Sequence, residues 1–436
     1  MTATLASAAA TGGELRPECQ VLVVGAGPAG GDLARQLAQA GVDVQLVDQL
    51  ADLSSAAFSS AAMPLEAIEQ YGLAAELAAA RWSRWQLIGP GTVQRQWTSD
   101  RTLGVVLDFG RLRCWLAEAC RQWGGSVALG WKAIACRPEG RRLRTRLRDR
   151  RGAELEVLSD WVVDASGQQR ALIGETSPPA EPLVIGLGCE WLLQAPLPLW
   201  QRWSDRLAFC LGSGWVEQGY GWVFPMEPGQ LKVGVCRLVD PCRRQPALGA
   251  ELERLIARLF PAAERRELRV LDRHGGRIRS RIRRREPHRQ GRLIALGDAV
   301  STANLLGGEG IRHALASSRV LAPRLLEAIA ADTADGLPRT GGASGRRVPL
   351  PSPGRHDPLA SYPQALRRRL GWRWSLSGRL ARRTWLGLRD VSSDRRLDLL
   401  LQGLESCSAE DLSALLFDYR FERYGWRALP YLLGWR

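Results

Sequence analysis

Residues 20–48 restrict the fold of this chain more than any other stretch. They read as an apolar strand, a tight turn, a helix and a second apolar strand that ends at Asp48. The turn consists of small residues and one proline: Gly25, Ala26, Gly27, Pro28, Ala29 and Gly30. A G-x-G-x-x-G turn between a strand and a helix, followed by an acid at the end of the next strand, is the fingerprint of dinucleotide binding. The sequence therefore predicts a Rossmann-like α/β domain.

Each glycine of this turn has a separate predicted task. Gly25 makes the turn, Gly27 lets the backbone approach a pyrophosphate, and Gly30 lets the helix pack on the strand. The helix N-terminus, which begins at Pro28 and Ala29, favours negative charge, and Asp48 can accept a hydrogen bond from a ribose hydroxyl. The pattern alone does not distinguish NAD from FAD.

The net charge of the chain, +15, suits an anionic partner. A diphosphate substrate, a membrane surface, an acidic electron donor and nucleic acid would all be attracted. However, Lys132 and Lys232 are the only lysines, and the arginines are scattered along the chain. A GC-rich genome produces the same pattern without selection for binding, so charge alone leaves the partner open.

The cysteines and the N-terminal residues indicate the compartment. Nine cysteines include no C-x-x-C pair, which argues against a disulfide framework or a zinc site and favours a reducing environment. Residues 2–16 lack the charged and apolar regions of a secretory signal, and no apolar run is long enough to cross a membrane. We expect a cytoplasmic protein that is not secreted and binds no metal.

Strand and helix patterns divide the 436 residues into more than one domain. An α/β pattern runs to a strand that ends in a small-residue turn with Ala165 and Gly167, a further close approach to the cofactor. Alternating, aromatic-rich strands follow, which is typical of an inserted antiparallel sheet, and then the α/β pattern returns. The predicted parts are a disordered N-terminus (1–16), a dinucleotide-binding domain (17–182 and 287–335), a substrate domain (183–286), a linker (336–361) and a C-terminal helical region (362–436).

A second Gly-Asp pair decides which dinucleotide is expected. A buried strand ends at Gly297 and Asp298. The helix after it is opened by a glycine-rich turn: Gly307, Gly308, Glu309 and Gly310. A nicotinamide enzyme does not need a second Gly-Asp at a strand end, whereas an FAD stretched across the domain does. The positive N-terminus of that helix would stabilise the negative charge of a reduced flavin.

These elements resemble those of FAD-dependent oxidoreductases of the p-hydroxybenzoate hydroxylase fold and, within them, the geranylgeranyl reductases. The resemblance covers residues 20–330 and is sharpest at Tyr220-x-Trp222-x-Phe224-Pro, which is similar to the Y-x-W-x-F-P stretch of those reductases. It implies noncovalently bound FAD, with Asp298 at the ribityl chain and the glycine-rich turn beside the flavin ring. It also implies that the aromatic residues, which share one strand face, line an isoprenoid cavity.

The resemblance also assigns residues where the pattern differs. The arginine that the family uses at the pyrophosphate falls on Phe109, so we expect Arg111 or Arg113 to serve there. Reduction of an isolated alkene also needs a proton. Tyr220, Glu309 or a water molecule can supply it, and with Trp222 these residues are the catalytic candidates.

Other flavoproteins and other functions remain to be weighed. Flavin halogenases need a catalytic lysine that Lys132 and Lys232 do not match, and lycopene cyclases carry an acidic strand where residues 231–236 have no acid. Aromatic hydroxylases need only flavin, oxygen and a fitted pocket. Residues 367–389, rich in arginine and tryptophan, suit a helix that covers the core, an interfacial helix on anionic lipid or, without a recognised motif, a nucleic-acid binder.

The predicted protein is an α/β FAD-dependent oxidoreductase with an inserted β-sheet domain and a C-terminal helical region. We expect it to reduce C=C bonds of an isoprenoid or similarly hydrophobic small molecule, with electrons from NADPH or a reduced ferredoxin. A flavin-dependent monooxygenase and a non-redox, lycopene-cyclase-like flavoprotein are the alternatives. Peripheral membrane contact fits a lipid-soluble substrate, and nucleic acid is not an expected partner.

Overall fold

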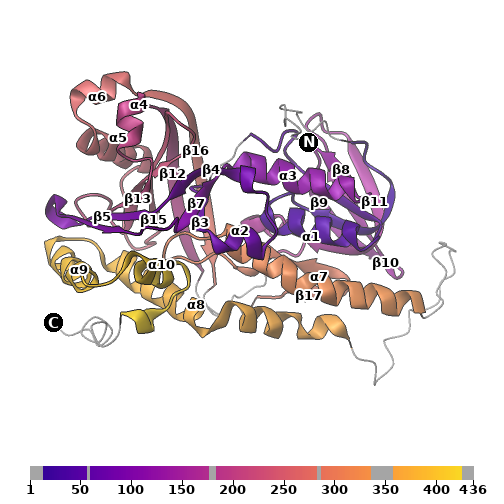
Figure 1. Cartoon of the computed structure of the whole chain (residues 1–436). Coiled ribbons are helices and arrows are strands. Elements are labelled where there is room, and N and C mark those ends of the chain that lie inside the picture. The colour runs from indigo at the N-terminus through magenta and orange to yellow at the C-terminus, as the bar shows by residue number, and fades with distance from the viewer. Residues whose placement is uncertain (1–12, 56–58, 176–182, 282–285, 335–356, 425–436) are drawn as a thin grey trace.

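The computed structural model describes residues 13–55, 59–175, 183–281, 286–334 and 357–424. Two large β-sheets lie side by side, and the C-terminal helices extend beneath both of them in the view of Figure 1. Among the described residues, no helix is both long and apolar enough to span a bilayer.

The first sheet has a parallel core of five strands. In spatial order these are β18 (Leu293–Ala295), β11 (Glu154–Asp164), β1 (Glu18–Val24), β2 (Val44–Asp48) and β8 (Ser126–Leu129). Three further strands extend it: β17 (Arg289–Gln290), β9 (Lys132–Glu139) and β10 (Arg142–Arg148). The core strands are nearly continuous apolar runs because helices cover them, as parallel sheets require.

The carboxyl ends of three core strands meet at one edge of this sheet. Val24 pairs with Asp164, which pairs with Ala295. The turns that follow these strands therefore lie next to one another, where open α/β sheets bind their ligands. Helix α1 (Pro28–Gln39) packs against α3 (Phe109–Gln122) and α7 (Ile311–Ala334).

The second sheet has seven strands, and all neighbours are antiparallel except β13 and β5. In spatial order its strands are β16 (Arg269–Ser280), β12 (Val184–Gln194), β15 (Gln230–Leu238), β14 (Gly219–Pro225), β13 (Arg206–Leu211), β5 (Arg84–Ile88) and β6 (Gln94–Thr98). One face packs on α5 (Leu248–Leu259), with α4 (Leu197–Gln201) and α6 (Ala262–Glu267) nearby (Figure 1). The aromatic side chains of β14 lie on the other face.

The remaining elements join the two sheets and cover them. A small sheet contains β3 (Ala62–Pro64), β7 (Gly104–Leu107) and β4 (Ala78–Trp82), and α2 (Glu66–Gln70) follows β3. The C-terminal helices are α8 (Tyr362–Gly387), α9 (Val391–Leu404) and α10 (Ala409–Phe417). Helix α8 is interrupted at Gly371, whose φ is 77°. Its first part packs on the first sheet, and its second part packs on the second.

The structure confirms the predicted fold class and revises some boundaries. Strands β5 and β6 were assigned from the sequence to the first domain, but they pair with the second sheet because β5 aligns beside β13. Most of the predicted N-terminal disorder (1–16) and of the linker (336–361) lies outside the described residues. The ends of both are ordered, since Arg16 pairs with Asp43 and residues 358–361 form a helical turn.

Candidate functional site

The turn after β1 and the turn after β11 touch through their backbones. Gly25 has a φ of 109°, and a Cβ on Gly30 would overlap the Gly25 carbonyl oxygen and lie 2.9 Å from the Ala165 Cβ. The Asp164 carboxylate, fully buried, fixes the second turn by accepting hydrogen bonds from the backbone N–H groups of residues 166, 172 and 173. The second turn, which includes Gly167, thus lies directly beside the N-terminus of α1.

Gly27, at the N-cap of α1, differs from these glycines. A Cβ placed on it would meet no atom of the chain within 4 Å. Packing of the chain therefore does not require glycine there, whereas close approach of a pyrophosphate does. Asp48 lies beside the same turn and accepts hydrogen bonds from the N–H groups of Ala26 (2.7 Å) and Leu50 (2.8 Å). Its carboxylate oxygens keep a second lone pair each for a ribose hydroxyl.

Of the two candidate arginines, Arg113 is the one that lies near this turn. Arg113 is 7% exposed, its guanidinium donates to the Ser55 carbonyl oxygen, and its buried Nε has no hydrogen-bond partner among the described residues. Burial lowers the pKa of this guanidinium, and the Asp48 carboxylate opposes that shift. Arg111 points the other way and pairs with Glu227 at 2.5 Å, because residues two apart on a helix face opposite sides. In this conformation Arg113 is therefore the better-placed of the two candidates for the pyrophosphate.

The strand-end Gly-Asp pair lies against the first turn of α1. A Cβ on Gly297 would come within 2.7 Å of the Ala29 Cβ. Asp298 accepts hydrogen bonds from the Thr302 hydroxyl (3.0 Å) and the Ala303 N–H (3.1 Å). Burial raises the pKa of Asp298, and these two donors oppose the shift. Its side chain reaches the wall of a cavity that also contains Pro28 and the glycine-rich turn.

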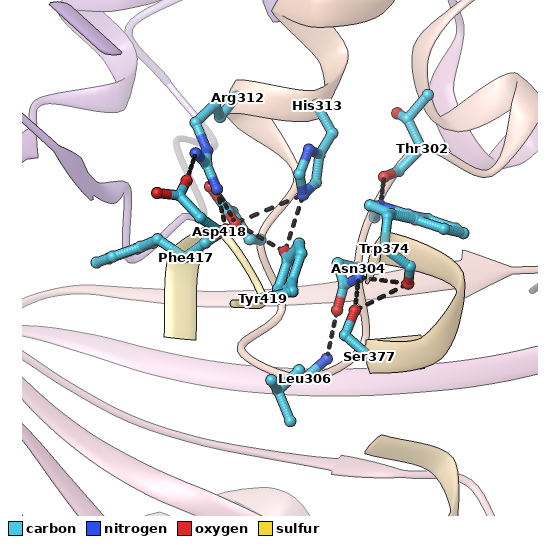
Figure 2. Close-up of polar contacts among 12 residues, drawn as sticks. Thr302, Asn304, Leu306, Arg312, His313, Trp374, Ser377, Phe417, Asp418 and Tyr419 are labelled. Carbon is cyan, nitrogen blue, oxygen red and sulfur yellow. Dashed lines mark hydrogen bonds and ion pairs between the residues drawn. The ribbon is translucent and has the colours of Figure 1, made fainter. Parts of the chain in front are cut away.

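The glycine-rich turn is closed and then tied to the C-terminal helices. The Asn304 N–H donates to the Glu309 carbonyl oxygen at 2.8 Å, which closes the turn over Gly307 and Gly308, and Gly310 follows directly before α7. The Asn304 side chain donates to Ser377 Oγ at 2.6 Å in α8 (Figure 2). The start of this turn is therefore held by a buried helix of the C-terminal region.

A second tie holds the end of the turn, at the N-terminus of α7. Glu309 pairs with Arg312 at 2.5 Å and accepts a hydrogen bond from the Tyr419 hydroxyl at 2.9 Å. Arg312 also pairs with Asp418, and His313 lies 2.9 Å from the same hydroxyl (Figure 2). Burial opposes ionisation of Glu309, but Arg312 and His313 hold its pKa at about 2. Glu309 is therefore an ion-paired carboxylate that holds no proton at neutral pH, which favours Tyr220 or a water molecule among the predicted proton donors.

Tyr220 lies opposite this turn on β14. A Cβ placed on Gly308 would be 3.3 Å from the Tyr220 hydroxyl. The hydroxyl is hydrogen-bonded to Cys236 on the neighbouring strand, and burial raises its pKa well above the usual value for tyrosine. Tyr220 therefore stays protonated at neutral pH, directly beside the predicted flavin ring.

Trp222 is held by a buried acid two strands away. Its indole N–H donates to Glu190 Oε2 at 3.0 Å, and a Cβ on Gly234 would overlap the indole ring. The ring can cross β15 only because Gly234 has no side chain. Lys232, also buried, donates to the Ser59 carbonyl oxygen at 2.6 Å. Burial raises the pKa of Glu190 and lowers that of Lys232, while each charge favours ionisation of the other.

Sequence reasoning did not identify several residues that shape this site. Asn304 and Tyr419 carry no motif, and their roles depend on contacts with distant helices. Glu190 and Lys232 could have been recognised from the sequence, because each is a charged residue within an otherwise apolar, alternating strand. The spacing of Glu309 and Arg312, three residues apart at a helix start, is also typical of an ion pair.

Two cavities meet at Tyr220. One, of about 260 Å³, extends from Pro28 past Asp298 to Tyr220 and Trp222. The other, of about 240 Å³, lies between the second sheet and the C-terminal helices. The second cavity has apolar walls: Trp85, Leu207, Leu376, Leu380, Leu400, Leu404, Leu415, Phe417 and Phe421. Ser59, Tyr220 and Gly308 line both cavities, so the two cavities adjoin each other.

The residues in and near the first cavity fit FAD. Gly27 leaves room for a pyrophosphate, Arg113 has an unpaired Nε, and Asp298 faces the cavity midway. The positive N-terminus of α7 lies at the far end, where reduced flavin would gather negative charge. Fold and site together define a flavoprotein of the FAD-dependent oxidoreductase class.

The comparisons with known proteins agree with this class. The chain belongs to the FAD-binding-domain family, whose profile matches residues 18–348. It is related to the geranylgeranyl reductases: a digeranylgeranylglycerophospholipid reductase of Haloferax volcanii is 25% identical over 316 residues, which are 69% of this chain and 74% of the relative. The prediction of an FAD-dependent oxidoreductase related to these reductases is confirmed.

Solved structures show the same fold at lower sequence identity. A geranylgeranyl bacteriochlorophyll reductase-like protein of Thermoplasma acidophilum superposes with a TM-score of 0.76 at 20% identity and covers 96% of this chain and 99% of its own. The p-nitrophenol 4-monooxygenase of Pseudomonas putida superposes with a TM-score of 0.67 at 17% identity, with 94% and 99% covered. The fold is thus shared by proteins named as reductases and as monooxygenases.

Proposed function

We propose that this enzyme reduces C=C bonds of an isoprenoid chain or a similarly hydrophobic substrate. The observation that carries the proposal is the apolar cavity between the second sheet and α8–α10, which adjoins the predicted flavin site at Tyr220. An apolar tunnel that ends at a few polar groups suits a long hydrocarbon chain with one reacting bond. The name of the Haloferax relative, a reductase of a digeranylgeranyl lipid, supports the same substrate class.

Each end of the proposed site has its own task. Gly25, Gly27 and Gly30 hold the AMP and pyrophosphate part, with Asp48 at the ribose and Arg113 beside the phosphates. Asp298 holds the ribityl chain. When bound, reduced FAD supplies hydride to an alkene carbon.

Tyr220 is the proposed proton donor. Its hydroxyl lies at the junction of the two cavities, and its raised pKa keeps the proton in place until the adjacent carbon becomes basic. Trp222, fixed by Glu190, forms the apolar wall beside it and keeps water away from the reacting bond. Glu309 does not donate a proton in this scheme, because its pKa is about 2. Its task is to anchor the glycine-rich turn.

The electron source is proposed to be NADPH or a reduced ferredoxin. Enzymes of this fold have no separate nicotinamide domain, so the lack of a second nucleotide motif does not argue against NADPH. Anaerobic titration of the holoenzyme with each donor distinguishes them, because the competent donor bleaches the oxidised flavin band. If neither donor nor dithionite bleaches it, the redox function is excluded.

Mass analysis of the product tests the proposed reaction. The reduced enzyme is incubated without oxygen with geranylgeranyl diphosphate or a geranylgeranyl ether lipid. A gain of two hydrogens supports the proposal. An unchanged mass with a new ring means a cyclase, and a gain of oxygen in air means a hydroxylase, which the fold of the Pseudomonas monooxygenase keeps as the second candidate.

Substitution of Tyr220 tests its role in that reaction. We expect Tyr220→Phe to lower kcat by about 10²–10⁴-fold while the flavin is still reduced at its normal rate. Tyr424→Phe is the matched control, since Tyr424 lines only the apolar cavity. Equal kcat values for the two variants would contradict the assignment of the proton donor.

A further inference from the structure

The outer side of helix α8 carries arginines that no acid of the described residues neutralises. Five of them are exposed and form no ion pair with any described residue: Arg367, Arg368, Arg379, Arg382 and Arg383. On the same helix, Arg373 does have a partner, Glu422. The helix therefore presents a concentrated positive charge to its surroundings.

Arginines elsewhere on the surface are arranged differently. On β10, Arg142, Arg144, Arg146 and Arg148 alternate along the strand, and each pairs with an acid of a neighbouring strand. Biased codon use would enrich arginine on both β10 and α8. It would not, however, pair the arginines of β10 with acids and leave those of α8 unpaired. The unpaired set on α8 therefore calls for a partner outside the chain.

The exposed arginines share their helix face with a tryptophan. Trp372, Arg379 and Arg383 are seven and four residues apart, so their side chains project from one side of α8. Trp372 is 65% exposed, which is unusual for a large aromatic side chain. Arg382 lies on the flank of the same face.

This face adjoins the apolar cavity. Leu376, Leu380 and Thr384 are successive neighbours at intervals of four on α8, and all three line that cavity. On a helix with 100° per residue, Leu376 lies only about 40° from Trp372 and Leu380 about 80°. A single helix thus separates the cavity from the basic, tryptophan-bearing surface.

We propose that this face of α8, formed by Trp372, Arg379, Arg382 and Arg383, docks the enzyme on an anionic phospholipid bilayer. Arginine guanidinium groups bind lipid phosphates, and an exposed tryptophan sits at the headgroup level. The cavity beside Leu376 and Leu380 then lies next to the hydrocarbon from which a lipid-soluble molecule would enter. An acidic protein would also attract the arginines, but it gives no reason for an exposed tryptophan among them.

Vesicle binding tests this without any turnover, so its outcome is independent of the proposed reaction. The FAD-loaded enzyme is mixed with vesicles of two parts phosphatidylcholine to one part phosphatidylglycerol, or of phosphatidylcholine alone, and sedimented. Each basic residue at an anionic surface contributes roughly fivefold to partitioning, so R379Q/R383Q should bind about 30-fold more weakly. W372S should weaken binding to both vesicle types.

The matched control is R146Q/R148Q, which removes the same two charges from β10. It should bind the anionic vesicles like the unchanged enzyme, and high salt should weaken binding of both. If both double variants lost binding equally, the effect would depend on the net charge of the protein and not on this face of α8, and the proposal would be overturned. A second outcome would also overturn the proposal: the enzyme does not bind anionic vesicles, and it binds an acidic ferredoxin with an affinity that R379Q/R383Q lowers.

Discussion

At the proposed AMP end of the site, the backbone itself sets the geometry: Gly25, Gly30 and Ala165 touch across two turns, and neither Gly25 nor Gly30 has room for a side chain. At the flavin-ring end, the corresponding turn is held by side chains, from Glu309 to Arg312 and Tyr419. A side chain added at a backbone–backbone contact has nowhere to go. A network of hydrogen bonds and ion pairs, in contrast, can lose one bond and keep the others. Gly25 and Gly30 should therefore tolerate no side chain, whereas the second turn should respond in steps.

The largest expected effect comes from the backbone contact. Gly30→Ala places a methyl group on the Gly25 carbonyl oxygen, so we expect the free energy of unfolding to fall by roughly 3–5 kcal/mol. Chemical denaturation of the FAD-free protein measures it. Gly27→Ala is the control within the same turn: its Cβ meets no atom of the chain, so stability should stay within about 0.5 kcal/mol while FAD binding weakens. If both variants were equally stable, the steric account of this end would fail.

The next effect comes from the charge at the other end. Glu309 has a folded pKa of about 2 against an ordinary 4.5, so its ionisation contributes roughly 3 kcal/mol above the unfolded pKa. A depressed pKa means that this contribution is lost as pH falls from 4.5 through 2. We expect Glu309→Gln to be destabilised by that amount at pH 7 and the difference to vanish near pH 2. Denaturation of both proteins across this range checks it, and a pH-independent difference would contradict the ion pair.

The smallest effect comes from a single hydroxyl group. Tyr419→Phe removes the hydrogen bonds of this hydroxyl to the Glu309 carboxylate and to His313, which should cost about 1–2 kcal/mol and weaken FAD binding several-fold. Tyr424→Phe, which loses a bond to the Leu400 carbonyl oxygen in the same segment, should lose similar stability without changing FAD affinity. The comparison separates a tie to the flavin turn from general packing of the C-terminal helices. FAD affinity that is unchanged in Tyr419→Phe would show that the turn does not need the tie.

The same contrast explains what the sequence could predict. The AMP end lies within one short strand–turn–helix unit, and the aromatic face of Tyr220 and Trp222 follows from strand periodicity, so both are visible as local patterns. The low pKa of Glu309 could not be read from a local pattern, because it depends on Arg312, His313 and burial. Strands β5 and β6 were missed as part of the second sheet because their partner, β13, is a hundred residues away. Asn304 and Tyr419 were missed for the same reason.

The tie between Tyr419 and Glu309 also sets an order of events during synthesis. The ribosome releases the AMP site early, and α7 with its glycine-rich turn follows long afterwards. Tyr419, Asp418 and Ser377 emerge later still, so a nascent chain that has reached α7 can present the nucleotide site but not an anchored flavin turn. We therefore expect stable FAD binding only after the complete chain has left the ribosome. A chain truncated after α7 should purify without the yellow colour of bound flavin.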